Sequence, residues 1–458
     1  MSLDQSRRAF MKHAAALGIA GGAAPFVVSL AAIGEAAAAT ASDYKALVCI
    51  FLYGGNDYAN TVTPYDQPSY ALYAGLRSTI AHPRASLAAT LLNPTVALPG
   101  GRQYALAPNL APLIPIFDAG RLAVILNVGA LVQPTSKPNY LNRSVQLPPK
   151  LFSHNDQQSF WQASNPEGAI TGWGGRIGDL LQSGNGSATL TCINASGNAV
   201  FLAGQTAIQY GVTTNGPVPL LNNASALFGS AAGMSALRGL MTGPRANLFE
   251  DEHAKVCKRS LDLQAQVSGA LAGGPAIATP FPANNALADQ LRIVARLISV
   301  SQELGAKRQV YFVSLGGFDN HDSILTQHPI LMTRLGAAMR AFHDATVELG
   351  VVDKVTSFTA SDFGRTLTSN ANGSDHGWGS MHFAMGGAVN GRRFYGTPPA
   401  IADNGPDDVG QGRLLPSMSV DQYAATLASW FGVGSGQLPT VLPNINNYNP
   451  STWNLGFV

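Results

Sequence analysis

The sequence predicts an α/β protein with a mainly parallel central sheet sandwiched by helices. Three observations support this class: short continuous apolar runs, longer segments with apolar residues at three and four spacing, and alternation of the two along the chain. Alternating strands and helices favour a parallel sheet with helices on its faces. The 458 residues are enough for one large domain.

The predicted strands are short apolar runs bounded by glycine or turn residues, and the predicted helices are amphipathic. The strand at 309–315, the helix at 325–349 and the strand at 355–359 form one β-helix-β unit. In chain order, the expected strands are Lys45–Tyr53, Leu122–Val128, Gln309–Leu315 and Val355–Thr359, and the expected helices are Asn285–Leu304, Leu325–Leu349 and Val420–Phe431.

The stretch from about 189 to 282 departs from this alternation. It holds clusters of Gly, Ser, Ala and Asn, short β-like pieces and a predicted helix near Glu250 to Leu271. We therefore expect a loop-rich insertion or cap within a single α/β domain that covers residues 40–458. The 49 glycines and 28 prolines indicate long ordered loops, given the apolar content of 46%.

Residues 1–39 are predicted to be a twin-arginine signal peptide. Arg7 and Arg8 lie within Ser6–Lys12, an apolar stretch follows, and small residues at 36–39 offer a cleavage site. The export machinery is thus an expected partner, and the mature chain is expected in the periplasm or outside the cell. A permanent membrane anchor is disfavoured, because glycines and a proline interrupt the segment and large aliphatic residues are few.

Composition limits the classes of partner. Charged residues make up 12% of the chain and the net charge is +2, so a nucleic-acid or membrane-surface protein is disfavoured. The three cysteines do not form a paired-cysteine metal pattern. Cys49 lies in a predicted strand and is expected to be buried, whereas Cys192 and Cys257 could pair in an oxidising compartment.

Carboxylates and histidines cluster after the predicted strands of the second half. Asp319 and His321 follow two glycines, Asp362 and Arg365 follow the next strand, and His376 lies in a later glycine-rich loop. In an open α/β sheet, ligands bind outside the carboxyl ends of the strands. These side chains are therefore predicted to converge on one crevice and to bind a metal ion.

Structural alternatives exist for each motif. Asp319 could cap the following helix, and an isolated histidine is more often satisfied by hydrogen bonds. Arg365 could bind phosphate or sulfate oxygens, or it could form an ion pair with Asp362 that closes the loop. Asp57, which follows the first strand and two glycines, could reach the crevice or form an Asx turn.

The segment Phe152–Gln157 contains a candidate nucleophile. Ser153 is predicted at a helix N-terminus, where the macrodipole would favour an alkoxide and an incoming anion. The spacing Ser-x-x-Asp is also that of a capping box, so the hydroxyl could instead cap the helix. His154 could bind metal or transfer a proton.

The order of these motifs resembles the alkaline-phosphatase and sulfatase superfamily. The pieces Gly-Gly-x-Asp-x-His, Asp-Phe-Gly-Arg-Thr and Asp-His-Gly more closely resemble the exported bacterial family catalogued as domain of unknown function 1501. The resemblance implies an alkaline-phosphatase-like fold and a bimetal hydrolase ancestry. It also implies that Asp319, His321 and His376 form one metal site, a ligand set that suits zinc.

The second metal site implied by the resemblance is poorer in nitrogen. Asp57, Ser153 and Asp362 match it, but Phe363 stands where a histidine normally follows the last acid. Oxygen ligands favour magnesium, calcium or manganese, or the site is empty unless His154 substitutes.

The expected activity is metal-dependent hydrolysis of phosphate esters, in small molecules or polymers. Sulfate esters are less favoured, because the chain lacks the Cys-x-Pro-x-Arg sequence from which the resembling sulfatases make formylglycine. Ser153 would attack, His154 would bind metal or transfer a proton, and Arg365 would neutralise non-bridging oxygens. The alternative is a non-catalytic exported binding or scaffold protein, which Phe363 supports.

Overall fold

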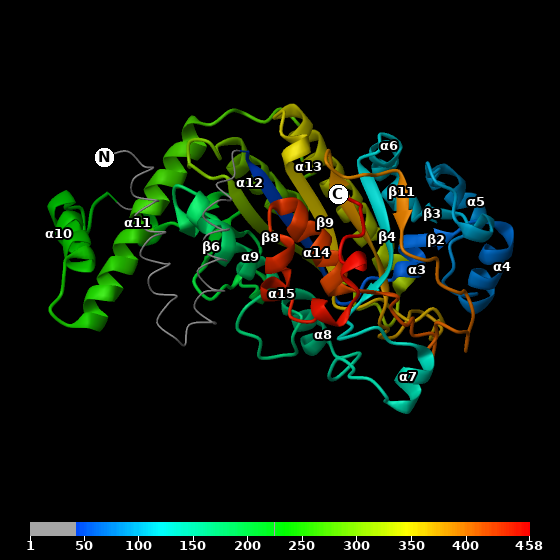
Figure 1. The fold of residues 1–458 in the computed structure, drawn as a ribbon. Helices are drawn as coiled ribbons and strands as arrows, with labels where there is room; N and C mark the ends of the chain where they lie inside the picture. The colour runs from blue at the N-terminus through cyan, green and yellow to red at the C-terminus, as the bar shows by residue number, and fades with distance from the viewer. Residues whose placement is uncertain (1–42, 224) are drawn as a thin grey trace, which may run out of the picture. The chain divides into compact units, whose positions relative to one another are not determined.

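A ten-stranded sheet forms the centre of the structure (Figure 1). The computed structural model describes residues 43–223 and 225–458, and Asp43–Val458 form one compact unit. In spatial order the strands are β11 (Arg393–Tyr395), β4 (Leu122–Gly129), β10 (Ser380–Gly386), β9 (Val355–Ser361), β1 (Lys45–Tyr53), β8 (Arg308–Gly316), β5 (Cys192–Asn194), β6 (Gln209–Thr213) and β7 (Gly216–Pro217), and β12 (Met418–Ser419) pairs with β4.

Most neighbouring strands are parallel, which confirms the predicted α/β class and mainly parallel sheet. β1 pairs in parallel with both β8 and β9, and β5 pairs in parallel with β8. β10 is antiparallel to β4 and to β9, and β6 and β7 form an antiparallel pair. The antiparallel β10 follows the glycine-rich loop that carries His376.

β1 lies between the two large hydrophobic cores, one on each face of the sheet. The even-numbered residues from Ala46 to Leu52 contribute to one core, and the odd-numbered residues from Leu47 to Phe51 contribute to the other. Successive side chains of a strand point to opposite faces, so an uninterrupted apolar run requires cover on both sides. The sequence of β1 therefore dictates a three-layer arrangement.

Helices supply this cover on both faces. α12 (Ala286–Ser299) and α13 (Ile324–Glu348) contribute to the core on one face, with α12 packed against α13 and β8. α9 (Trp173–Leu181) and α14 (Val420–Phe431) contribute to the other core, and α14 lies in front of the sheet in Figure 1. The expected sandwich of helices around the sheet is confirmed.

The predicted element bounds agree closely with the structure. β1 and α14 have the predicted ends, and α13 begins and ends one residue earlier than predicted. α12 ends at Ser299, whereas the sequence predicted it to reach Leu304. The helix ends early because the chain turns through residues 301–305, where Gly305 adopts a φ of 64°.

Residues 189–282 continue the central sheet at one edge. Their first strand, β5, pairs in parallel with β8, and β6 and β7 follow. α10 (Ala231–Thr242) and α11 (Leu248–Gly273) come next (Figure 1). The second half of α11 buries Leu263 and Val267 in the core. The segment expected as an insertion thus shares the main sheet and one hydrophobic core.

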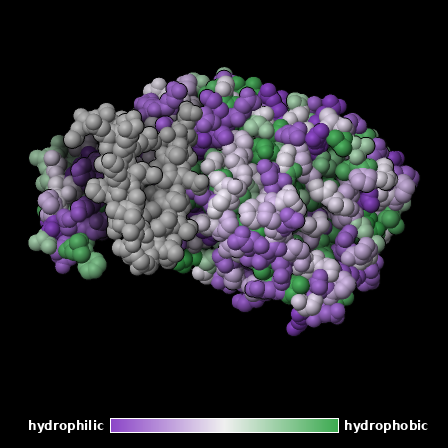
Figure 2. Space-filling model, in the orientation of Figure 1, coloured by the Kyte–Doolittle hydropathy of each residue, from purple (hydrophilic) through white to green (hydrophobic). Residues whose placement is uncertain are grey.

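All three cysteines are free thiols. Cys49 and Cys192 are buried and Cys257 is partly exposed on α11, so the disulfide considered between Cys192 and Cys257 is not formed. Within residues 43–223 and 225–458, no helix is long and apolar enough to cross a membrane. The predicted signal peptide at 1–39 lies outside the described residues. Figure 2 shows hydrophilic residues spread over the visible face, with hydrophobic residues in spots between them.

Candidate metal centre

Three neighbouring parallel strands, β8, β1 and β9, end at the same edge of the sheet. Tyr53 at the end of β1 pairs with Gly316 at the end of β8. Gly54 then turns with a φ of 113°, and a Cβ on Gly54 would lie 2.4 Å from the backbone nitrogen of Asp319. Only glycine permits this approach, which brings the turn after β1 against the turn after β8.

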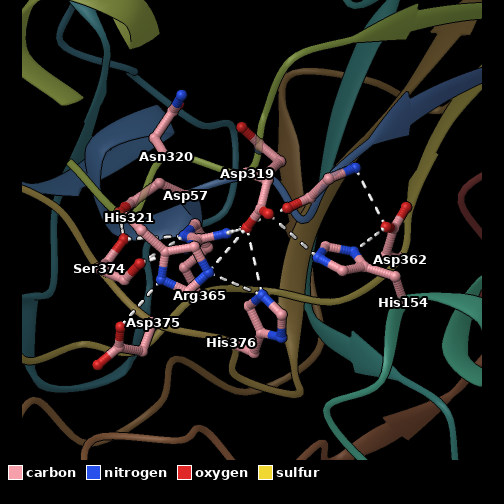
Figure 3. A network of polar contacts seen from close by, with 12 residues as sticks. Asp57, His154, Asp319, Asn320, His321, Asp362, Arg365, Ser374, Asp375 and His376 are labelled. Atoms are coloured by element: carbon pink, nitrogen blue, oxygen red, sulfur yellow. Dashed lines mark hydrogen bonds and ion pairs between the residues drawn. The ribbon is translucent and has the colours of Figure 1, made fainter. Parts of the chain in front are cut away.

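Asp319 lies among three histidine side chains at this edge (Figure 3). Its Oδ1 is 3.1 Å from Nε2 of His321 and 3.2 Å from Nε2 of His376. Its Oδ2 is 3.3 Å from Nε2 of His154, and the two Nε2 atoms of His321 and His376 are 2.9 Å apart. The four side chains are between 24% and 46% exposed, so solvent and small solutes reach them.

Carboxylates orient two of these imidazoles through the other ring nitrogen. Nδ1 of His154 lies 2.7 Å from Oδ2 of Asp362, and Nδ1 of His321 lies 3.1 Å from Oδ1 of Asp375. An ionised carboxylate only accepts hydrogen bonds, so each Nδ1 donates. In the neutral ring, Nε2 then keeps its lone pair and faces Asp319.

A backbone carbonyl orients the third imidazole. Nδ1 of His376 donates to the carbonyl oxygen of Phe152 at 2.8 Å. Phe152 has a φ of 72°, an uncommon conformation for a large aromatic residue that costs energy unless its surroundings impose it. Its ring packs edge-on against Trp378. The strained residue thereby places its carbonyl against the cluster.

The cluster therefore gathers hydrogen-bond acceptors. Lone pairs of two neutral imidazoles at 2.9 Å repel each other unless a proton or a cation lies between them. His154, Asp319 and His376 each offer a ligand atom, and these atoms lie within 4.8 Å of one another. Two imidazoles and a carboxylate suit zinc and similar divalent ions. The geometry and donor types fit a metal site, with His321 beside this group.

Asp362 is completely buried and acts on His154 rather than facing the cluster itself. Its Oδ2 accepts from the backbone nitrogen of Gly54 at 3.1 Å, from Nδ1 of His154 and from Nε2 of Gln158 at 2.8 Å. The bond to Asp362 raises the pKa of His154, although burial acts to lower it. A carboxylate that orients a metal-ligating histidine in this way is typical of metal sites.

Arg365 is also completely buried, and protein atoms accept from all three of its nitrogens. Nη1 donates to Oδ1 of Asp319 at 2.8 Å and to the carbonyl of Gly54 at 3.1 Å, while Nε and Nη2 donate to the carbonyl of Ser374. Burial acts to raise the pKa of Asp319, but Arg365, together with the charges of His154 and His321, lowers it overall. The predicted role of Arg365 on substrate oxygens is therefore not supported; it holds Asp319 as an ion pair.

The structure does not bring Asp57 into the cluster. One oxygen accepts from the backbone nitrogen of Asn60 at 3.0 Å, and the other pairs with Arg77 and accepts from Oγ of Ser374 at 2.7 Å. Asp57 thus caps a short helix, close to the Asx alternative, and its partners occupy both oxygens. Asp57 and Asp362 have no direct hydrogen-bond partner in common, and neither is among the grouped ligand atoms of His154, Asp319 and His376. The described residues therefore do not support the second metal site that the sequence predicted.

Ser153 lies at the N-terminus of α8 (His154–Ala163), as predicted. Its hydroxyl makes no bond to the helix backbone and donates instead to Oδ2 of Asp156 at 3.0 Å. The capping box considered from the sequence is therefore not formed. Ser153 is partly exposed and directly precedes His154 of the cluster in the chain.

Sequence reasoning missed residues that orient the cluster. Gln158 lies one helical turn after His154 and shares its acceptor, so the i, i+4 spacing on a predicted helix was a usable signal. Asp375 lies in the Asp-His-Gly motif, but its hydrogen bond to His321 depends on the conformation of the loop, which the motif does not specify. The carbonyl of Phe152 has no signature in the sequence, because every residue carries a carbonyl.

Residues 244–433 match the model of a family described as "Protein of unknown function (DUF1501)". This segment is thus similar to the DUF1501 family. It contains Asp319, His321, Asp362 and His376, so the resemblance expected from these motifs is confirmed. His154 lies outside the DUF1501 match, on α8.

Two of the solved proteins to which the chain is similar in structure illustrate the likeness. One is PsFucS1 sulfatase from Pseudoalteromonas sp., with 11% identity, 94% of this chain and 73% of that chain covered, and a TM-score of 0.32. The other is Ps i-CgsB in complex with k-i-k-neocarrahexaose, with 11% identity and a TM-score of 0.35. The match covers 89% of this chain and 78% of that chain. No curated protein matches the chain in sequence. The DUF1501 description assigns no activity, so a function must be argued from the cluster.

Proposed function

We propose that this protein is an exported hydrolase that binds a divalent metal ion and cleaves phosphate esters. One observation carries the proposal: the Nε2 atoms of His154, His321 and His376 all lie within 3.3 Å of a carboxylate oxygen of Asp319. Acceptor atoms gathered in this way require a cation or shared protons between them. When bound, a divalent ion would polarise a phosphoryl oxygen of the ester.

The ion would be held by His154, Asp319 and His376, the three residues whose ligand atoms lie within 4.8 Å of one another. Zinc suits two imidazoles and one carboxylate. Nε2 of His321 lies 2.9 Å from Nε2 of His376, and His321 would become a fourth ligand if its ring shifts toward the ion. Arg365 would keep Asp319 ionised and fixed, because its guanidinium donates to Oδ1 at 2.8 Å.

Ser153 is the proposed nucleophile. Its oxygen would form a bond to phosphorus as the bond from phosphorus to the ester oxygen breaks, and its proton would pass to Asp156, which accepts from it at 3.0 Å. The N-terminus of α8 would stabilise the phosphoryl group through its exposed backbone N–H groups. Water would then release phosphate from the serine ester.

Phosphate esters are favoured over sulfate esters by the chemistry of the chain. None of the cysteines lies in Cys-x-Pro-x-Arg, so formylglycine chemistry has no starting residue. Serine, by contrast, is a suitable nucleophile toward phosphorus. The substrate would be a small molecule or a polymer that carries a phosphate ester.

A second candidate is an exported binding or scaffold protein that keeps the metal but does not turn over substrate. Phe363 favours it, because its ring lies 4.9 Å from the ring of His154 and 4.7 Å from that of His376. An apolar ring beside two cluster imidazoles takes space that a substrate or a second ion would use.

Hydrolysis of phosphate mono- and diesters by metal-loaded protein distinguishes the two candidates. Asp319→Ala should abolish hydrolysis, whereas Asp322→Ala, which alters an exposed carboxylate three residues away, should leave it unchanged. Hydrolysis that survives Asp319→Ala would refute the proposed mechanism. A wild-type protein that binds metal but hydrolyses none of the esters would favour the scaffold.

A further inference from the structure

Besides the proposed metal ion and the N-terminus of α8, the proposed hydrolase has no assigned cationic side chain for the non-bridging oxygens of its substrate. Charge on these oxygens is commonly neutralised by arginine, lysine or a metal ion. Arg365 is fully committed to protein acceptors and is completely buried. Lys150 is 69% exposed and already lies within 4.0 Å of the carboxylates of Asp156 and Glu167. A different cation is needed near the cluster.

Arg413 lies beside His376 and has unused donors. Its Nε donates to the carbonyl oxygen of His376 at 3.1 Å, and its Cζ lies 4.5 Å from the centre of the Phe152 ring. Among the residues that the structure describes, nothing bonds to its Nη1 or Nη2. The side chain is partly exposed. The guanidinium is thus anchored at one nitrogen and stacked on one face, with two nitrogens left to bind a solute.

Phe152 supports both the metal centre and this guanidinium. Its carbonyl accepts from Nδ1 of His376, its ring carries Arg413, and its φ of 72° is strained. The loop behind Arg413 is closed by hydrogen bonds to Gly410 and Val409. Stacking and the Nε bond reduce the freedom that the arginine would lose on binding an anion. The same strained residue fixes an imidazole and an arginine next to each other.

We propose that Arg413 binds the oxyanion of the substrate, with Nη1 and Nη2 donating to two non-bridging oxygens of a phosphate or sulfate group. This inference rests on the proposed function, because it assigns the anion site of the same centre. The planar fork of arginine matches two oxygens of such a group, which a lysine ammonium does not. Arg413 is then a specificity-determining residue, and the family motif residue Arg365 only positions Asp319.

Binding of inorganic phosphate, measured by calorimetry on the full mature protein with its metal content determined in parallel, tests the inference. Arg413→Gln should weaken phosphate binding by about tenfold or more while metal content stays unchanged. Arg413→Lys should fall between this variant and the wild type. Arg392→Gln is the matched control, since Arg392 is also partly exposed and donates through Nε to a carbonyl, that of Asn93. It should bind phosphate like the wild type.

Phosphate affinity of Arg413→Gln within twofold of the wild type would overturn the inference, and so would an equal loss in Arg392→Gln. If Arg413→Gln fails to fold, the phosphate affinity of Arg413→Lys tests the inference. Lysine keeps the positive charge but lacks the planar pair of donor nitrogens. Undetectable binding of phosphate to metal-loaded wild-type protein would also overturn it while leaving the metal centre intact. Failure of the proposed function would be seen separately, as wild-type protein that binds no metal or hydrolyses none of the phosphate esters. Titration with sulfate on the same samples shows which anion the fork prefers.

Discussion

Asp362→Asn should weaken binding of a divalent metal by about 10-fold to 100-fold. Oδ2 of Asp362 is buried and accepts from His154, Gly54 and Gln158 at 2.7, 3.1 and 2.8 Å. Asparagine keeps the shape and one oxygen but removes the charge that makes His154 a stronger ligand and fixes its ring. Loss of an orienting carboxylate typically costs 10-fold to 100-fold in metal affinity, which is about 1.4 to 2.7 kcal/mol.

Competition with a chromogenic chelator at neutral pH would measure this affinity for zinc. Gln158→Ala is the control, because it removes a neutral donor from the same oxygen and leaves the carboxylate charge and the bond to His154 in place. Its affinity should stay within about threefold of the wild type. If Asp362→Asn also stays within threefold, Asp362 does not act through His154 and the orientation argument is wrong.

Buried charges and the proposed export signal provide further tests. Burial raises the pKa of Asp421 to about 6, above the value of about 3.9 for an aspartate in the unfolded chain. The protonated carboxyl therefore stabilises the folded state fully below about pH 3.9, and this contribution is lost as the pH rises through about 6. Denaturation of the wild type should therefore show a loss of about 3 kcal/mol across this window that Asp421→Asn lacks. Arg77→Met leaves Asp57 buried without its cation and should lower the free energy of unfolding by about 3 to 5 kcal/mol. Arg7→Lys with Arg8→Lys should leave the precursor in the cytoplasm on cell fractionation.

Each of these three predictions would be contradicted by a specific result. Identical pH dependence in the Asp421→Asn variant and the wild type would show that this carboxyl does not titrate in the window. The exposed pair Arg292 and Asp289 is the control for Arg77→Met, and Arg292→Gln should change stability by less than about 1 kcal/mol. A loss that small for Arg77→Met would mean that Asp57 finds another partner. Export of the double-lysine variant would refute the signal peptide.

The sheet edge of the site was predictable because strand ends are encoded locally. An apolar run followed by glycines and an acid marks the carboxyl end of a buried strand, and parallel pairing then places neighbouring ends together. Asp319, His321 and His376 do lie together, as the motifs predicted. α14 was also predictable, since its apolar residues recur at helical spacing between Ser419 and Gly432.

The direction of each side chain was not predictable. Asp57 and Asp319 both follow a strand and two glycines, yet Asp57 turns to Arg77 and Asp319 turns to Arg365. These partners come from distant loops whose conformation no local pattern specifies. For the same reason Arg365 was open to two interpretations, and neither holds as stated. The side chain is completely buried, and its ion pair is with Asp319 instead of Asp362.

The metal content of the purified, folded protein tests the proposed metal centre most directly. Elemental mass spectrometry of the wild type beside His376→Ala would measure it, with Asp322→Ala as a control for an exposed acid. We expect about one equivalent of a divalent metal, with zinc favoured, in the wild type and the control, and its loss in His376→Ala. Wild-type protein without bound metal, or metal retained undiminished in His376→Ala, would contradict a metal site built from His154, Asp319 and His376.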